Sequence, residues 1–391
     1  RLMAYCASNV GMGHYCRLLR VVEELRRRRP ELTVLLATDA PDLAAARRLG
    51  LATLQLPRFR FVDEESFKEQ PESLAISSRD LRELRAQTLL AAGGAFQPDA
   101  LLMDTNPHGK RDELLPLLGH LRERTEGRAI LMLRDIPCPP GESFKLNGTA
   151  ASIGKHAAYY DRILLAGDPR FFDAPAVYGW PDAVRRRARF VGFVVPRLDP
   201  IARDRALAPY PRLNPAQPLV VAGFGGGWEV EAMLTHLLKG LAVYRRRALK
   251  PVQLIAATGP AVDEERLGFL RLEAEGLGGV VIERFLADFP QLLAQADLAV
   301  LQAGSTPFQL LEGDTPILLT VRDYKSREQD ERARRLASLP GVRLIERESP
   351  QWDDAGEWIA WGLDQPRQPR RTGLDFNGVA NAAEAVLALI P

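Results

Sequence analysis

The sequence predicts an α/β protein built from two doubly wound parallel sheets. Short apolar runs of strand length alternate with longer amphipathic segments up to residue 193, and the same alternation begins again at residue 219. Strands that are apolar along their length and separated by helices are typical of a parallel sheet covered on both faces. The 391 residues exceed what one core usually holds, so we expect the two alternations to form two domains.

In the first half, apolar runs predict the strands and helical periodicity predicts the helices between them. The predicted strands are residues 2–7, 32–37, 53–56, 100–103, 129–133, 163–166 and 190–193. The predicted helices include residues 15–28, 42–49, 78–96 and 111–124. The segment 63–78 is charged and poor in apolar residues, so we expect a mobile loop there.

Proline and polar residues gather between the two alternations and mark a linker, which we place at residues 199–217. The strands predicted after it are residues 219–223, 252–257, 280–283, 298–302, 316–321 and 342–345. The predicted domains are residues 1–198 and 218–374. The segment 375–391 contains a final amphipathic helix, about residues 378–389, that we expect to pack back on the first domain. Two such halves make a cleft, and ligands bind there at the carboxyl ends of the strands.

Composition limits the classes of partner. The 52 basic and 50 acidic residues give a formal net charge of +2, which argues against a nucleic-acid-binding protein. No apolar run reaches the roughly 18 to 20 residues of a membrane helix, and no leader resembles a signal peptide. The three cysteines, Cys6, Cys16 and Cys138, have no metal-binding spacing, and so sparse a set fits a reducing compartment. We therefore expect a cytoplasmic protein.

Three runs of arginine fall at the ends of predicted helices, at residues 26–29, 185–187 and 245–247. Cations at helix C-termini complement the helix dipole. The alternative is a basic rim that faces anionic lipid or an anionic acceptor, which leaves peripheral contact with a membrane open.

A glycine-rich turn separates the first predicted strand from the first helix, and it contains Gly11, Gly13 and His14. Glycines let the backbone turn tightly and come close to a ligand. The helix that follows offers unpaired amides and the positive end of its dipole. His14 can exchange a proton near neutral pH. The turn is therefore a candidate catalytic site, although short glycine turns before helices are also common as purely structural features.

A second glycine-rich loop, with Gly225, Gly226 and Gly227, follows the first strand of the second half and opens a helix. Such a loop exposes backbone amides to an anion. It lacks the Lys-Ser/Thr ending of a P-loop and the spacing of the dinucleotide fingerprint. We interpret it as a phosphate-binding loop, with a structural turn as the alternative.

Gly304, Ser305 and Thr306 follow another predicted strand and precede a helix with Pro307 in its first turn. Ser and Thr cap helices and Pro favours the first helical position, so an ordinary cap is one interpretation. The other is a diphosphate cradle made of hydroxyls and helix amides. Gln309, further along that helix, offers an acceptor oxygen for ribose hydroxyls.

Four more polar residues lie where a ligand could meet them. Glu328 and Gln329 open a predicted helix and can bind sugar hydroxyls, or they form a solvated first turn. Asp104 and Arg134 stand at the carboxyl ends of predicted strands, facing the expected cleft, and each could equally cap the loop that follows.

The order of these motifs resembles that of nucleotide-sugar glycosyltransferases of the GT-B fold. It most resembles a bacterial family of predicted glycosyltransferases, itself similar to the UDP-N-acetylglucosamine transferases that form lipid II. The similarity covers nearly the whole chain. The residues that carry it are 11–14 with Arg17, 99–104, 133–136, 225–227, 258–260, 303–304, and 328–329 with Arg332.

The resemblance implies two Rossmann-like domains separated by a cleft. The second domain is expected to bind a nucleoside-diphosphate-sugar, UDP-linked in the family, and the first a small or lipid-linked acceptor. The implied diphosphate site is residues 304–306, with the base near Phe285 and the donor sugar near Glu328 and Gln329. No metal or other cofactor is expected, because helix amides carry the charge stabilisation.

On the acceptor side, the resemblance implies that His14 is the catalytic base or orients the acceptor. Asp104 is assigned with His14 to catalysis, and Gly11, Gly13, Arg17 and Arg134 to the acceptor side. The implied reaction is metal-independent sugar transfer with inversion at the anomeric carbon.

Two alternatives stay open. UDP-sugar hydrolases share the Gly13-His14 pair with Arg17, and there the histidine activates water. A nucleotide-sugar-binding scaffold or regulatory protein without turnover is the second alternative, because Gln309 stands where the family has a ribose-binding Glu.

Overall fold

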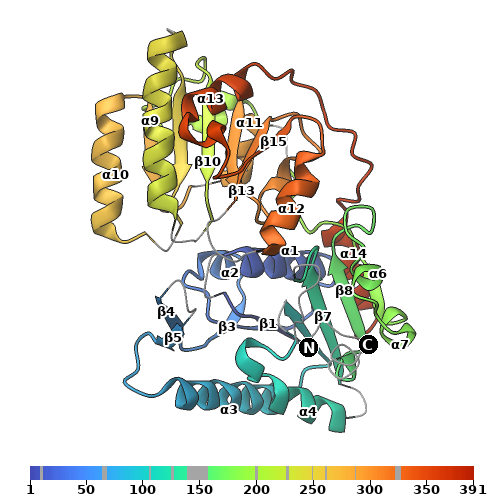
Figure 1. Cartoon of the computed structure of the whole chain (residues 1–391). Coiled ribbons are helices and arrows are strands. Elements are labelled where there is room, and N and C mark those ends of the chain that lie inside the picture. Colours follow the sequence, from blue (N-terminus) through green and yellow to red (C-terminus); the bar gives the residue numbers. More distant parts are fainter. Residues whose placement is uncertain are drawn as a thin grey trace. The chain divides into compact units, whose positions relative to one another are not determined.

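The computed structural model divides the chain into two compact units (Figure 1). Unit 1 comprises residues 1–195 and 374–391, and unit 2 comprises residues 196–373. Each is a parallel sheet with helices on its faces. The structure describes residues 1–8, 12–63, 68–104, 107–124, 127–138, 157–198, 201–225, 229–248, 250–259, 262–286, 288–321 and 327–391.

Unit 1 contains a seven-stranded sheet in the order β3-β2-β1-β6-β7-β8-β9, and all its pairs are parallel. The order reverses between β1 and β6, as in a doubly wound sheet. The strands are β1 (Leu2–Cys6), β2 (Val34–Thr38), β3 (Ala52–Gln55), β6 (Ala100–Asp104), β7 (Arg128–Arg134), β8 (Arg162–Ala166) and β9 (Ala188–Phe190).

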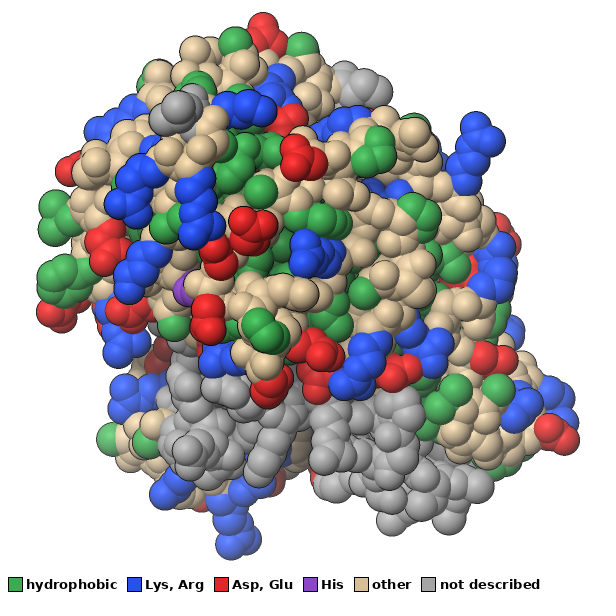
Figure 2. Space-filling view, turned by 45° about the horizontal axis from the view of Figure 1, so that its top comes forward, with side chains coloured by type: hydrophobic (Ala, Val, Ile, Leu, Met, Phe, Trp, Pro, Cys, Tyr) green, Lys and Arg blue, Asp and Glu red, His purple; other side chains and the backbone are tan. Residues whose placement is uncertain are grey.

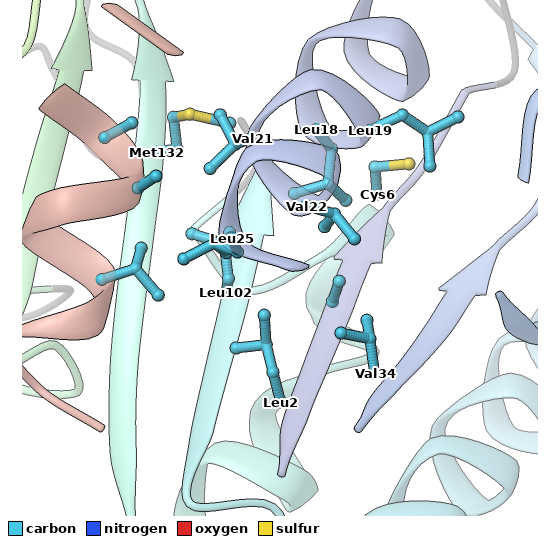
Figure 3. Packing of buried hydrophobic residues seen from close by; sticks show 14 of the residues in the cluster. Leu2, Cys6, Leu18, Leu19, Val21, Val22, Leu25, Val34, Leu102 and Met132 are labelled. Atoms are coloured by element: carbon cyan, nitrogen blue, oxygen red, sulfur yellow. The ribbon is translucent and has the colours of Figure 1, made fainter. Parts of the chain in front are cut away.

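The helices of unit 1 pack on this sheet through apolar faces. They are α1 (Gly13–Arg28), α2 (Ala44–Arg48), α3 (Ser78–Phe96), α4 (Leu115–Glu123), α6 (Ala174–Val177), α7 (Asp182–Arg185) and α14 (Gly378–Leu387), with a short 3-10 turn, η1 (Lys110–Asp112). Figure 3 shows Val21 and Leu25 of α1 facing Met132 of β7 and Leu102 of β6. The final helix α14 joins the same apolar cluster and packs against α1.

The expected mobile loop over residues 63–78 is wrong in part. β4 (Phe59–Asp63) and β5 (Lys68–Pro71) form a separate antiparallel hairpin in unit 1. The charged residues of β5 do not form the apolar run that predicts a strand. One of them, Glu69, accepts a 2.6 Å hydrogen bond from Nζ of Lys110. Because the two residues are far apart in sequence, no local sequence pattern predicts this contact.

Unit 2 repeats the design with a six-stranded sheet, β12-β11-β10-β13-β14-β15, again parallel. Its order reverses between β10 and β13. The strands are β10 (Leu219–Gly223), β11 (Gln253–Ala257), β12 (Val280–Glu283), β13 (Leu298–Gln302), β14 (Ile317–Thr320) and β15 (Val342–Ile345). The helices are α8 (Arg203–Leu207), α9 (Val230–Ala248), α10 (Glu264–Leu277), α11 (Phe289–Gln295), α12 (Arg327–Ala337) and α13 (Ala355–Leu363), with the 3-10 turns η2 (Pro307–Leu310) and η3 (Pro350–Asp353).

The segment 199–217, expected as a linker, belongs to unit 2. It contains α8, which packs against α11. Arg203 at the start of α8 donates a 2.9 Å hydrogen bond to Asp297, just before β13. Pro209, Pro211 and Pro215 lie in turns that follow this packed helix.

Among the described residues on the face shown in Figure 2, basic and acidic side chains are interspersed, and neither sign covers a large area. The nearly balanced formal charge is therefore mixed and not segregated on this face. Within the described part of the chain, no helix has both the length and the apolar character needed to span a membrane.

Candidate functional site

The candidate site of unit 1 lies at the point where its strand order reverses. β1 and β6 are neighbours, and Cys6 pairs with Asp104 at their carboxyl ends. The chain leaves β1 and begins α1 at Gly13, so His14 lies in the first turn of the helix above that edge. Gly11 lies outside the described residues. Two side chains that are 90 residues apart in sequence therefore meet at one edge of the sheet.

His14 and Asp104 form a hydrogen-bonded pair, with Nδ1 of the imidazole 2.9 Å from Oδ1 of the carboxylate. The Asp104 side chain is fully buried, whereas that of His14 is 27% exposed. Burial alone would raise the pKa of Asp104, but the charge of Arg17 and the hydrogen bond from His14 hold the pKa well below its usual range. An ionised carboxylate can only accept, so Nδ1 of His14 donates. The lone pair of the imidazole is then on Nε2.

Arg17 also binds the carboxylate of Asp104. Its Nε donates a 2.8 Å hydrogen bond to Oδ2, and its Nη2 donates to Oδ1. This fork is the arrangement in which Arg binds a carboxylate most strongly. Arg17 is 7% exposed. The family resemblance assigned Arg17 to the acceptor side, and the structure places its guanidinium against the catalytic candidate Asp104.

The imidazole of His14 has a lowered pKa. Burial is the main cause, and the nearby cations Arg17 and Arg134 act in the same direction, while Asp104 opposes them. Arg134 ends β7, the strand next to β6. A histidine with a lowered pKa is neutral near pH 7 and can accept a proton. Four of the predicted site residues of unit 1 thus act on one another.

In unit 2, the first candidate loop follows β10. Gly225 has φ 70°, in the left-handed region that favours glycine. Gly226 and Gly227 lie outside the described residues. The helix behind the loop, α9, begins at Val230.

The second candidate loop follows β13, which lies beside β10. Gly304 donates its amide to the carbonyl of Gln302 at 2.8 Å. Across the described residues, no acceptor takes the amides of Ser305 or Thr306, so both remain available to a ligand. The Thr306 hydroxyl forms no capping hydrogen bond, so the ordinary-cap interpretation is wrong for this side chain. The helix expected after it is only the 3-10 turn η2, too short for a large dipole.

Gln309 in η2 has an unusual acceptor. Its Oε1 is buried and has no hydrogen-bond partner among the residues that the structure describes. A buried acceptor without a partner costs free energy and calls for an explanation, such as a ligand that supplies a donor.

Arg332 fixes the loop after β13 from behind. It lies on α12 and is 2% exposed, and its Nη1 donates a 2.8 Å hydrogen bond to the carbonyl of Ala303. The sequence pointed to Arg332 only through the family resemblance. Glu328 and Gln329 lie in the first turn of the same helix and are half-buried.

Phe285 follows β12, the edge strand of the unit 2 sheet, and its side chain is 50% exposed. It is separated from β10 by one strand, β11, at the same carboxyl edge. Thr320, at the end of β14, was not singled out from the sequence. Its buried Oγ1 has no partner within the described ranges, and no local sequence pattern marks it. Those ranges contain no group of three or more His, Cys, Asp or Glu side chains that could hold a metal ion.

No protein-family model matches the chain, and no curated protein matches it in sequence. Solved structures do match it over nearly their full length. MurG of Acinetobacter baumannii is 12% identical, with 100% of this chain and 99% of that chain covered and a TM-score of 0.54. The glycosyltransferase VinC, solved with dTDP, is 14% identical, with coverage of 100% and 96% and a TM-score of 0.56. UDP-GlcNAc 2-epimerase of Neisseria meningitidis, solved with UDP-GlcNAc, is 9% identical, with 99% of each chain covered and a TM-score of 0.62.

Identities this low show the fold alone. Each unit has the Rossmann-like strand order. The structural similarity to glycosyltransferases and to 2-epimerases extends over both units of this chain. The protein has the GT-B fold.

Proposed function

We propose that the protein is a metal-independent glycosyltransferase, which moves a sugar from a UDP-linked donor to an acceptor with inversion at the anomeric carbon. The observation that carries this proposal is the His14–Asp104 pair at the strand reversal of unit 1. The lowered pKa of His14 favours a neutral imidazole near pH 7, and donation from Nδ1 to Asp104 leaves the lone pair on Nε2. Such a pair is suited to take a proton from a nucleophile.

The chemistry is a single displacement. The acceptor oxygen attacks the anomeric carbon, and its proton passes to Nε2 of His14. The bond from that carbon to the diphosphate oxygen breaks, and the diphosphate leaves with the electron pair. Asp104 stabilises the imidazolium through the Nδ1 hydrogen bond. One displacement inverts the anomeric configuration.

Unit 2 would bind the donor. The amides of Ser305 and Thr306 and the loop at Gly225 are suited to the charge of the leaving diphosphate, as a fixed set of donors that needs no metal. The buried Oε1 of Gln309 is suited to a ribose hydroxyl. We assign Phe285 to the base, as an exposed aromatic ring.

Glu328 and Gln329 are assigned to the hydroxyls of the donor sugar. The ligands in two matching structures, dTDP and UDP-GlcNAc, contain a pyrimidine nucleoside diphosphate, which supports that class of donor. Cys6, Cys16 and Cys138 form no disulfide with one another, in keeping with a proposed cytoplasmic location.

The test begins with ligand binding. A panel of nucleotide-sugars is screened by thermal shift, because a ligand that binds only the folded state raises the midpoint of unfolding. The best donor, labelled in its sugar, is then incubated with the full chain and with lipid-linked and soluble acceptor pools. We expect label in a new glycoside, formed only with an acceptor.

The other outcomes overturn the proposal in distinct ways. Labelled free sugar without acceptor indicates a hydrolase, and a changed sugar still linked to its nucleotide indicates an epimerase. Binding without turnover under all acceptors indicates a scaffold. In the expected case, His14→Ala lowers kcat by roughly 100-fold or more and leaves the affinity for the donor nearly constant.

A further inference from the structure

We propose that Arg17 is a positioning residue that sets which nitrogen of His14 holds the proton. By binding both oxygens of Asp104, it keeps that carboxylate as an acceptor for Nδ1–H and so keeps the lone pair on Nε2. What the lone pair does rests on the proposed function. The placement of the proton follows from the contacts among these three side chains.

Nδ1 of His14 lies close to two groups that require opposite hydrogen-bonding roles of it. It lies 2.9 Å from Oδ1 of Asp104 and 2.9 Å from Nη2 of Arg17. Toward the carboxylate it must donate, whereas toward the guanidinium it must accept. The fork from Nε and Nη2 of Arg17 keeps Asp104 an ionised acceptor, and an unprotonated Nδ1 would then set its lone pair against Oδ1. Nδ1 therefore holds the hydrogen.

Without Arg17, the same pair would take up an extra proton at a higher pH than in the native protein. The Asp104 side chain is fully buried, and burial by itself favours the neutral acid. The extra proton either converts the imidazole to imidazolium or makes Asp104 a donor to Nδ1. In both states Nε2 bears a hydrogen and cannot act as a base.

Other charges around the pair remain when Arg17 is removed. Arg134 on β7 also lowers the pKa of His14, and it stays in place. Asp135 and Cys6 face Arg17 from the ends of β7 and β1. The loss of Arg17 should therefore shift the titration of the pair and not abolish it.

The test reads the proton directly. The chain has five histidines, so a sample labelled with 15N in histidine gives few signals, and His14→Gln identifies those of His14. The 15N shift of Nε2 separates a nitrogen with a lone pair from one with a hydrogen. Spectra are recorded from about pH 5 to about pH 9, which brackets the ordinary histidine pKa.

We expect Nε2 of the native protein to have a lone pair at neutral pH. In Arg17→Met, Nε2 should keep its hydrogen to a pH higher by about one unit or more. Arg17→Lys, which restores a cation without the fork, should lie between the two. Arg20→Met is the matched control, because Arg20 lies one turn further along α1 and, in the described part of the chain, has no hydrogen bond to His14 or Asp104. It should titrate as the native protein does.

Two results would overturn the inference: a hydrogen on Nε2 of the native protein at neutral pH, or a folded Arg17→Met that titrates at the native midpoint. If Arg17→Met does not fold, the tautomer of His14 in the native protein and the titration midpoint of His14 in Arg17→Lys still test the inference. The readout needs neither donor nor acceptor, so it stands apart from the test of sugar transfer. Where sugar transfer is found, the acid side of the pH profile of kcat should move to higher pH in Arg17→Met, and the KM for the donor should stay unchanged.

Discussion

The buried guanidinium of Arg332 donates a 2.8 Å hydrogen bond to the carbonyl oxygen of Ala303. Ala303 is fully buried and directly precedes the loop Gly304–Thr306. A helix of unit 2 therefore fixes the start of the loop that we assign to the donor diphosphate. The side chain acts on the backbone, so its effect on a ligand is indirect.

Replacing Arg332 by Met leaves a buried carbonyl without this donor, and we expect the free energy of unfolding to fall by about 1 to 3 kcal/mol. The affinity for UDP should fall as well, because the amides of Ser305 and Thr306 lose their fixed position. Urea denaturation measures the first effect and calorimetric titration with UDP the second. Arg335→Met is the control, since Arg335 lies on the same helix and pairs with Glu331 at the surface. Native UDP affinity in a folded Arg332→Met would contradict the assignment.

Arg85 of α3 is the centre of a buried ionic network in unit 1. Its Nε and Nη2 lie 2.6 and 2.7 Å from the two oxygens of Glu113, and its Nη1 lies 3.0 Å from Asp39. Tyr5 of β1 donates to the same carboxylate of Glu113 at 2.5 Å. Arg85→Met leaves two buried carboxylates without their cation, so we expect a loss of about 3 to 5 kcal/mol in the free energy of unfolding.

The matched control for Arg85 is Arg79→Met, because Arg79 lies on the same helix and is exposed. Its replacement should change the free energy of unfolding by less than about 0.5 kcal/mol. Equal losses in the two variants would show that the network adds no stability beyond that of a surface arginine. Both are measured by urea denaturation at neutral pH.

Most strands of the two sheets could be predicted because they are short apolar runs that are buried along their length, such as β1 and β6. The edge strands β3 and β9 are partly exposed. β10, β12, β13 and β15 begin and end where the sequence places them. Most other boundaries differ by one or two residues. The hairpin β4–β5 could not be predicted, because its polar residues are held by partners such as Lys110 that lie elsewhere in the sequence.

The candidate residues were predictable one by one, but their contacts were not. His14 and Asp104 each stand at a strand end, and only the strand order makes those two ends adjacent. The two hydrogen bonds from Arg17 to Asp104 depend on the same strand order. The buried Oε1 of Gln309 depends on the packing of η2, which no residue pattern encodes.

The stability of the protein should depend on pH through His14. Its folded pKa is lowered, whereas the unfolded side chain titrates near about 6.5. Just below that pH the unfolded chain binds more protons, so the free energy of unfolding falls as the pH drops. Asp104 acts in the same direction at lower pH. Its folded pKa is also lowered, so its contribution is present above about pH 4 and is lost below it.

We expect His14→Gln to remove the loss of stability that begins near about pH 6.5 and to keep the loss below about pH 4. The measurement is urea denaturation at a series of pH values. His120→Gln, another histidine of unit 1 on α4, is the control and should behave as the native protein. If the native protein and His14→Gln had the same pH dependence between about pH 5 and pH 7, the lowered pKa of His14 would be wrong.

The loop after β10 offers a test of the donor site that separates strain from binding. Gly225→Val places a β-branched side chain at φ 70°, so it introduces backbone strain and also blocks close approach of a phosphate to the loop. Gly278→Val also introduces backbone strain, at φ 61° and at the end of α10, with nothing within 4 Å of the added Cβ. Both variants should lower the midpoint of thermal unfolding. Only Gly225→Val should weaken UDP binding, by about tenfold or more, since a loss of 1.4 kcal/mol corresponds to a factor of ten. Equal affinities for UDP in the two folded variants would show that the loop does not approach the diphosphate, and the donor site would then have to be sought away from β10.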